Sequence, residues 1–267
     1  MITKTKSLTL LLVSFVMAAM LALTACASQT HHNNDDTSFV VGFDQNFPPF
    51  GFVGNDGAYT GFDLEVAQEV AKRQGWTFVA QPINWDAKDA EINAGTIDCI
   101  WNGFTIQGRE DAYAFTSPYM DNAQVIVVRA DSGIQSFADL AGKNVETQVD
   151  SAALHLFEGE NKELANSFKQ LTLVPDYNTG FQDLAAGATD ALAMDLTVAN
   201  YQIKDRPEDF YILPEQLAKE QYGVAFKKDN TELRDKVQQT LEEMAKDGSL
   251  AEISSKYFGS DVTRIAK

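Results

Sequence analysis

The chain has 267 residues, of which 45% are hydrophobic and 10% aromatic, and its 38 acidic and 21 basic side chains give a formal net charge of −17. This composition excludes fibrous, coiled-coil and wholly disordered proteins, and the negative field repels nucleic acids and anionic membrane surfaces. The two cysteines, Cys26 and Cys99, form no CxxC motif and no Cys/His cluster, so neither a disulfide scaffold nor a zinc module is expected.

The first residues have the order of an export signal. Lys4 and Lys6 precede an apolar run at residues 8–23, and small residues follow it. A membrane span needs about 20 apolar residues, so this run is too short and too polar to be one. We predict a signal peptide at residues 1–25. Residues 23–26 resemble the lipobox of bacterial lipoproteins, which implies a lipid tether on Cys26; a plain secretory signal is the alternative.

Residues 26–38 contain the possible lipidation site and then only small or polar side chains. Such a stretch cannot bury enough apolar surface to fold, and it is expected to be a flexible linker. His31 and His32 could bind a metal, but no carboxylate or thiol is fixed beside them, so a solvated linker is the favoured interpretation.

From residue 38 onward, short β-branched and aromatic runs alternate with amphipathic ones, a pattern typical of α/β proteins. Strands are predicted at residues 39–43, 77–81, 97–101, 124–128, 143–147, 171–174, 191–194 and 222–226. Helices are predicted at residues 62–74, which stop at Gly75, at residues 137–140 after the cap residue Ser136, and along the apolar stripe of residues 233–244.

The sequence lacks the common catalytic motifs. It has no G-x-S-x-G, no H-E-x-x-H, no P-loop and no G-x-G-x-x-G after a strand, so no cofactor or metal is expected. His155 lies among apolar residues of a predicted helix, where a surface or packing role is favoured over general-base chemistry. Cys99 and Trp101 are expected in the core.

The residues just beyond the carboxyl ends of the strands indicate a binding site more clearly, because open parallel sheets bind ligands there. These residues are Asp44, Phe47, Trp85, Asn102, Gly103, Thr105, Arg109, Gln148, Asp150, Ser151 and Asp195. One cation, several anions and two aromatic rings would suit a zwitterionic ligand.

At these residues the chain resembles the polar amino acid solute-binding proteins of ABC importers, solute-binding family 3. The resemblance is carried by residues 41–50, 61–64, 115–119, 139–143 and 222–226, in the family's order. It implies a type II periplasmic-binding-protein fold, in which two α/β lobes joined by two crossover strands enclose a ligand cleft. Lobe 1 would comprise residues 39–120 and 222–267, and the inserted lobe 2 residues 121–221.

The resemblance also assigns roles to individual residues. Arg109 matches the arginine that binds the ligand α-carboxylate, although the loop from Thr105 is one residue shorter than usual; a surface salt bridge to Glu110 or Asp111 is the alternative. Asp195 matches the aspartate that receives the α-ammonium group, and its alternative is to cap the following helix. Asp190 is expected to be structural.

Four further positions follow from the same comparison. Gln148 and Ser151 match a turn that helps to cradle a carboxylate, in which Asp150 replaces the family's glycine. Asp150 either contacts a cationic ligand end or caps the next helix. Phe47 and Trp85 match rings that sandwich the ligand side chain, with core packing as the alternative for Phe47.

The resemblance predicts a monomeric, extracytoplasmic binding protein that closes on a free amino acid and delivers it to a membrane permease and its ATPase. Asp44, with Asp150 beside it, would face the ligand side chain and favour a basic or amide amino acid over an acidic one. Two alternatives are a cyclohexadienyl-dehydratase-like enzyme on the same fold and an amino-acid-sensing lipoprotein. Retention of Arg109 and Asp195 argues against the enzyme.

Overall fold

The computed structural model describes residues 38–265. The predicted signal peptide, Cys26 and the His31 and His32 pair lie outside the described residues. No helix between residues 38 and 265 is long and apolar enough to cross a membrane.

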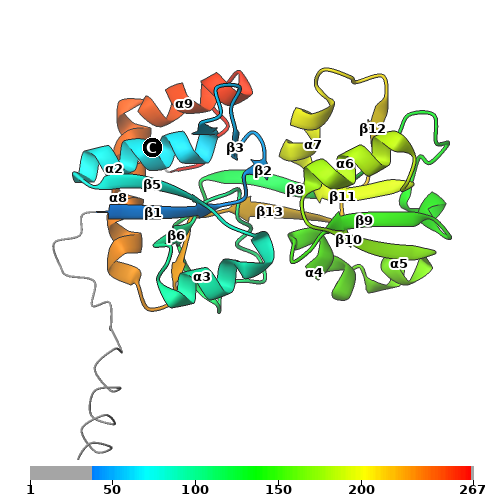
Figure 1. Ribbon diagram of the computed structural model, residues 1–267, viewed down its shortest axis with the longest axis horizontal. Helices are drawn as coiled ribbons and strands as arrows, with labels where there is room; N and C mark the ends of the chain where they lie inside the picture. Colours follow the sequence, from blue (N-terminus) through cyan, green and yellow to red (C-terminus); the bar gives the residue numbers. More distant parts are fainter. Residues whose placement is uncertain (1–37, 266–267) are drawn as a thin grey trace, which may run out of the picture. The chain divides into compact units, whose positions relative to one another are not determined.

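The first of two large sheets contains the N-terminal strand of the described chain, and we call the region around it lobe 1. Its strand order is β5-β1-β6-β14-β7, with β1 parallel to β5 and β6 and with β14 antiparallel to β6 and β7. Helices α2 and α9 lie on one side of this sheet and α3 on the other (Figure 1). The strands are β1 (Ser38–Phe43), β5 (Thr77–Pro82), β6 (Cys99–Ile100), β7 (Tyr113–Phe115) and β14 (Ala225–Lys227). The helices are α2 (Phe62–Gln74), the 3-10 turn η1 (Trp85–Ala87), α3 (Lys88–Ala94), α8 (Thr231–Asp247) and α9 (Ser249–Phe258). A small sheet is formed by β2 (Asn46–Phe47), β3 (Gly51–Val53) and β4 (Tyr59–Thr60).

The second large sheet defines lobe 2. Its order is β10-β9-β11-β8-β12, and β13 also pairs with β8. Helices α6 and α7 lie on one side of it, and α4 and α5 on the other (Figure 1). The strands are β8 (Met120–Arg129), β9 (Asn144–Gln148), β10 (Gln170–Val174), β11 (Ala191–Asp195), β12 (Phe210–Ile212) and β13 (Ala218–Tyr222). The helices are the 3-10 turn η2 (Phe137–Leu140), α4 (Ala152–Glu158), α5 (Lys162–Ser167), α6 (Tyr177–Ala186) and α7 (Leu196–Ile203).

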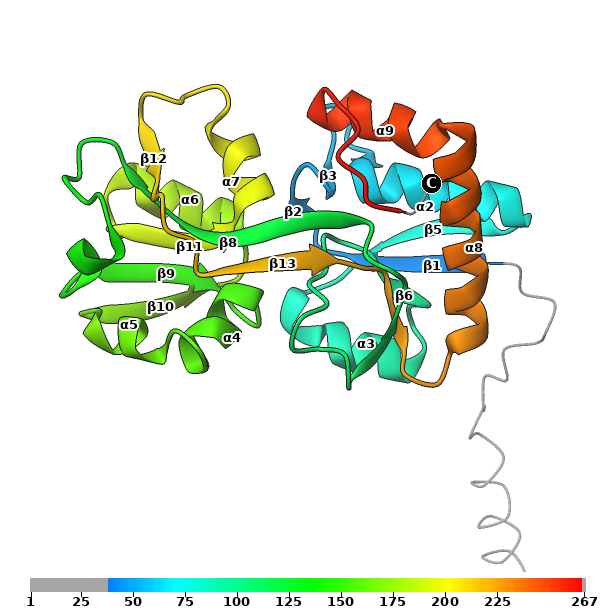
Figure 2. The same cartoon turned by 180° about the vertical axis from the view of Figure 1, so that it is seen from behind.

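Two antiparallel strands, β8 and β13, connect the lobes. They pair from Met120 opposite Tyr222 to Gln124 opposite Ala218, and both run from one lobe into the other (Figure 2). The α/β architecture of two lobes with two crossover strands is therefore confirmed. The residue boundaries of the lobes stay a prediction.

Most predicted elements lie where expected. The helix at residues 62–74 has the predicted bounds and ends at Gly75, whose φ of 74° places it in the left-handed region that suits glycine. Ser136 forms a capping box with Asp139 at the start of η2. Cys99 and Trp101 are buried in the core, as predicted.

The predicted strand at residues 222–226 is wrong. Residues up to Tyr222 belong to β13 in lobe 2, whereas β14 begins at Ala225 in the sheet of lobe 1. The two residues between them bond outside these ladders, because Gly223 N–H donates to the Phe104 carbonyl and Val224 N–H to the Thr116 hydroxyl. A continuous apolar run thus hides the point where the chain leaves one sheet for the other.

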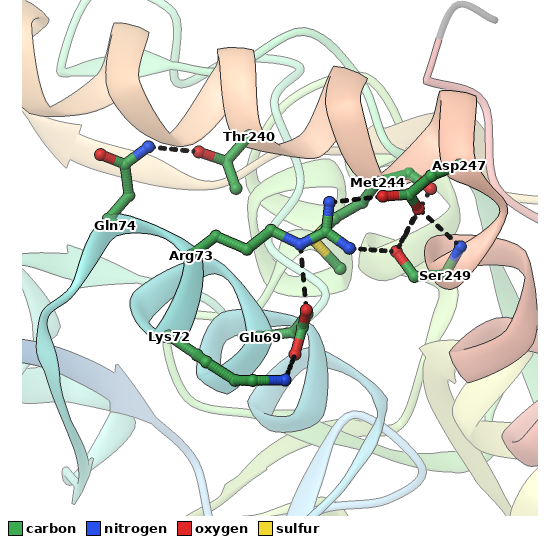
Figure 3. Close-up of polar contacts among 8 residues, drawn as sticks. All are labelled: Glu69, Lys72, Arg73, Gln74, Thr240, Met244, Asp247 and Ser249. Carbon is green, nitrogen blue, oxygen red and sulfur yellow. Dashed lines mark hydrogen bonds and ion pairs between the residues drawn. The ribbon is translucent and has the colours of Figure 1, made fainter.

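Helix α2 is attached to the C-terminal helices by polar contacts at the surface of lobe 1 (Figure 3). The Arg73 guanidinium donates to Glu69 at 3.0 Å, to Asp247 at 2.7 Å and to the Ser249 hydroxyl at 2.9 Å. Gln74 donates to the Thr240 hydroxyl at 2.8 Å. These bonds fix the position of α2, whose N-terminal end lies near the loops described next.

Candidate functional site

A small cavity of about 20 Å³ lies between the two lobes. Its lining residues are Phe47, Trp85, Gly103, Phe104, Thr105 and Arg109 from lobe 1, and Gln148, Ser151, Ala152, Tyr177 and Asp195 from lobe 2. Eight of the ten predicted ligand-binding residues therefore line one cavity, because the strand ends of both sheets face it. The other two, Asp44 and Asn102, lie just behind its wall.

Arg109 reaches this cavity despite the short loop that carries it. The turn is closed by a bond from Arg109 N–H to the Ile106 carbonyl, and the side chain is only 7% exposed. The guanidinium lies 4.5 Å from the centre of the Phe104 ring and donates to the Thr105 and Asp150 carbonyls at 3.3 and 3.5 Å. It makes no ion pair with the neighbouring acids among the described residues, so the surface salt bridge is not observed. These long bonds leave the guanidinium able to pair a carboxylate in the cavity.

Asp195 stands at the carboxyl end of β11, where the chain enters α7. It occupies the cap position, but its side chain accepts no bond from the helix. Its Oδ1 instead accepts from Asn122 at 3.0 Å, Gln124 at 2.8 Å and the Tyr222 hydroxyl at 2.6 Å. Burial and then the charge of Glu220 raise the pKa of Asp195 well above its ordinary value. These bonds hold the carboxyl group at the cavity, where a cationic ligand group would stabilise its ionised form.

Asp44 joins the lobes rather than lining the cavity. Its Oδ2 accepts from Gln148 Nε2 of lobe 2 at 2.7 Å, and its Oδ1 accepts from Asn46 N–H at 2.8 Å. Asn102 supports it, because its side-chain oxygen accepts from Asp44 N–H at 3.2 Å. Burial raises the pKa of Asp44, and the hydrogen bonds from Asn46 and Gln148 partly offset this rise. Asp44 thus positions Gln148, which does line the cavity.

The aromatic lining comes from both lobes. Phe47 belongs to a buried apolar cluster that includes residues of both lobes, and its ring centre lies 5.9 Å from that of Tyr177 in lobe 2. Trp85 packs edge-on against Phe104, with ring centres 5.5 Å apart. Phe47 therefore combines the two roles that the sequence left open, since it packs in the core and also lines the cavity.

Of the two roles left open for Asp150, the cap of the next helix is wrong. Ser151 is the cap of α4, because its hydroxyl accepts from Leu154 N–H at 3.1 Å. Asp150 instead forms an ion pair with Lys88 of lobe 1, and its other oxygen lies 3.2 Å from His155 Nε2. Its φ of 55° explains why its side chain points away from the helix start. His155 has the predicted surface role, and Asp190 the structural one, through a bond from Asn144 N–H.

Several residues of this site were missed in the sequence. Lys88 is buried in α3, Tyr177 begins α6, and Glu220 is buried on the crossover strand β13 beside Asp195. Lys88 and Glu220 appear in the sequence as ordinary charged residues of a helix and a strand. Only the pairing of β13 with β8 brings Glu220 next to the cavity.

A family model of bacterial extracellular solute-binding proteins, family 3, matches residues 39–260. The chain belongs to this family. It is thus an extracellular solute-binding protein rather than an enzyme, and the dehydratase alternative is wrong. The lipid anchor at Cys26 stays a prediction.

Individual family members differ in their ligands. The chain is 33% identical to the L-cystine-binding protein of Escherichia coli over 234 residues, 85% of each chain. It is 36% identical to a solved ABC uptake transporter substrate-binding protein from Streptococcus pneumoniae with bound histidine, at a TM-score of 0.82 over 85% of this chain and 94% of that one. It is 34% identical to ancestral arginine-binding proteins solved with arginine and with glutamine, at a TM-score of 0.76 over 84% of this chain and 99% of those.

Proposed function

We propose that this protein is the amino-acid-binding component of an ABC uptake transporter, and that its ligand is a basic or amide amino acid. The observation that carries the proposal is that Arg109 of lobe 1 and Asp195 of lobe 2 line the same cavity. A guanidinium on one side and a carboxyl group on the other can bind the two poles of a zwitterion. Ligand contacts to both lobes would stabilise the closed form that docks on a permease.

The choice of side chain follows from the charges around the cavity. Asp195, Glu220 and Asp44 are buried acids, whereas Arg109 is the buried cation left without an ion pair among the described residues. Lys88 is already paired with Asp150. An acidic ligand side chain would add a further like charge, at a cost of a few kcal/mol near a desolvated site. Basic and amide side chains avoid this repulsion.

Isothermal titration calorimetry with single amino acids, including cystine and ornithine, tests the proposal. We expect binding of arginine, lysine, ornithine, histidine or glutamine, and a loss of about 100- to 1,000-fold in affinity for Arg109→Ala, because the ligand carboxylate would be buried without a partner. The matched control is Arg206→Ala, an exposed arginine of lobe 2, which should bind normally. Binding of glutamate or cystine alone would contradict the charge argument, and unchanged binding by Arg109→Ala would contradict the site.

We also propose that the mature protein is tethered to the cell membrane by lipid at Cys26. The proposal rests on the sequence at residues 23–26. Cys26→Ser should move the protein from the membrane fraction to the soluble extracytoplasmic fraction without changing its affinity for the amino acid. A wild-type chain that is already soluble and carries no lipid by mass spectrometry would contradict the tether.

A further inference from the structure

Asp195 and Glu220 lie side by side between the lobes. Asn122 Nδ2 donates to Asp195 Oδ1 at 3.0 Å and to Glu220 Oε1 at 2.6 Å. Gln124 Nε2 donates to the same two oxygens at 2.8 and 2.9 Å. A side-chain amide nitrogen has two hydrogens, so each amide gives one hydrogen to each carboxyl group. The shared donors hold the two acids in adjacent positions.

The orientation of the Asn122 amide is fixed from the other side. Its oxygen accepts from Thr197 N–H at 3.2 Å and from the Thr197 hydroxyl at 2.9 Å, at the start of α7. The nitrogen must therefore face the acids. The Asn122 and Gln124 amides thus form a preorganised hydrogen-bonding site for one oxygen of each carboxyl group.

Neither acid has a cationic partner. Asp195 is 4% exposed and Glu220 5% exposed, and no lysine, arginine or histidine of residues 38–265 lies within 4.0 Å of either carboxyl group. Arg109 is the nearby cation, but it donates to two backbone carbonyls instead. Two adjacent negative charges in the protein interior repel strongly, and such pairs commonly retain one proton.

The remaining groups that face the pair do not supply a positive charge. The Tyr222 hydroxyl donates to Asp195 at 2.6 Å and the Thr105 hydroxyl to Glu220 at 3.0 Å. Burial raises the pKa of the Tyr222 and Tyr177 phenols well above the ordinary value, so both remain neutral at physiological pH. Burial likewise raises the pKa of Asp195, and the charge of Glu220 adds to this effect.

The pair separates two cavities. Asp195 lines the cavity with Arg109, whereas Glu220 lines a second hollow at the crossover strands, together with Asn122. The charged residues around that second hollow are Asp121, Lys219 and Arg264, of which Arg264 is paired with Asp121.

We propose that Asp195 and Glu220 hold one proton between them in the ligand-free protein, and that the α-ammonium group of the amino acid displaces this proton when it binds. This inference rests on the proposed function and makes Glu220 a second acid of the ammonium site. The ligand keeps its three ammonium hydrogens, the pair loses one proton, and the proton passes to solvent. Ligand uptake would therefore release about one proton in the pH range where the free pair is singly protonated.

The test is calorimetric titration of the full protein at pH 7 in two buffers, phosphate and Tris, which differ in their enthalpy of protonation. The difference in observed heat gives the number of protons released per ligand. We expect about one for the wild type and clearly fewer for Glu220→Gln, which leaves Asp195 buried but without an acidic neighbour. The matched control is Glu146→Gln, a buried glutamate of β9 outside the cavity, which should release the same number of protons as the wild type.

The affinity provides a second measurement. At pH values where the ligand-free pair still holds its proton, the Kd of the wild type should fall by up to tenfold for each unit that the pH rises. The Kd of Glu220→Gln should change much less over the same range. Wild-type binding with equal heats in both buffers would overturn the inference while leaving amino acid binding intact. Release of a full proton by Glu220→Gln would also overturn it. If no amino acid binds at all, the proposed function itself is refuted.

Discussion

The ion pair between Lys88 and Asp150 is predicted to hold the lobes together over the ligand. Lys88 of α3 is 2% exposed, and Asp150 of lobe 2 has 32% of its side chain exposed. Opening the cleft would separate the two charges and return Lys88 to water. Lys88→Met removes the charge but keeps an unbranched side chain that can still pack beside the Trp85 ring, whose centre lies 5.5 Å from the ammonium nitrogen.

The magnitude follows from the partial burial of the pair. Two unit charges about 4 Å apart attract by about 4 kcal/mol at the dielectric constant typical near a protein surface. Desolvation of the ammonium group offsets part of this, so a net coupling of about 1–3 kcal/mol is expected, or about 5- to 150-fold in the equilibrium between closed and open forms. Because the pair forms only as the lobes close, the loss should raise the rate of ligand release and leave association nearly unchanged.

The two single variants should differ in severity. Asp150→Asn leaves a buried ammonium group unpaired in the closed protein, whereas Lys88→Met leaves a partly exposed carboxylate that still has His155 at 3.2 Å. Stopped-flow measurement of ligand release across the double-mutant cycle gives the coupling energy. Lys72→Met is the matched control, because its pair with Glu69 lies on the surface of α2. Equal release rates for wild type and Lys88→Met, or a coupling below about 0.5 kcal/mol, would refute the reasoning.

The pair also has a defined pH dependence. Partial burial alone would raise the pKa of Asp150, but the bond and charge of Lys88, with those of His155, hold it below the ordinary value of 3.8. A carboxyl group with a lowered pKa stabilises the paired state above its ordinary pKa and loses this contribution as pH falls through the lowered value. Release should therefore be insensitive to this group above about pH 4 and accelerate in stronger acid, and Lys88→Met should lack the acid-dependent step.

Three further substitutions test the framework of lobe 1. Gly61→Ala should lower the free energy of unfolding by about 3 kcal/mol or more in urea titration, because φ is 139° and an added Cβ would lie 2.1 Å from the Phe50 carbonyl oxygen; an unchanged midpoint would contradict this. Burial raises the pKa of Asp63 to about 7, so its contribution to stability is greatest below pH 4 and declines as pH rises to 7. Asp63→Asn should remove this decline, of up to about 1.4 kcal/mol per pH unit, and a decline equal to that of the wild type would contradict the assignment. Arg73→Ala should cost no more than about 1 kcal/mol and less in high salt, because its ion pairs are close to solvent; a larger, salt-independent loss would contradict this.

The sequence predicted those parts of the fold that depend on local patterns. The apolar spacing of residues 62–74 and the glycine after them define α2 because both the buried stripe and the left-handed C-terminus are local features. The rule that ligand residues follow parallel strands placed Arg109 and Asp195 in one neighbourhood, and both line the cavity. The rule works here because each sheet directs its strand ends toward the other lobe.

The missed features depend on contacts between distant segments. Nothing local shows that the apolar run at residues 222–226 changes sheets, because that depends on which strands lie beside it. Lys88 and Glu220 look like solvated charges until the partner lobe or strand covers them. Asp150 replaces a family glycine, and its left-handed backbone decides that Ser151 caps the helix while Asp150 faces Lys88.

The charges of the site link the proposed ligand to the proposed proton. With one proton on the acid pair, its remaining charge is balanced by Arg109, and Lys88 balances Asp150. When a zwitterion displaces the proton, the acid pair, Arg109, Lys88 and Asp150 together carry one net negative charge. A basic ligand side chain restores the balance, whereas an acidic one doubles the excess. Basic ligands should therefore release the proton more completely than glutamine does, and the buffer comparison applied to both ligands measures this difference.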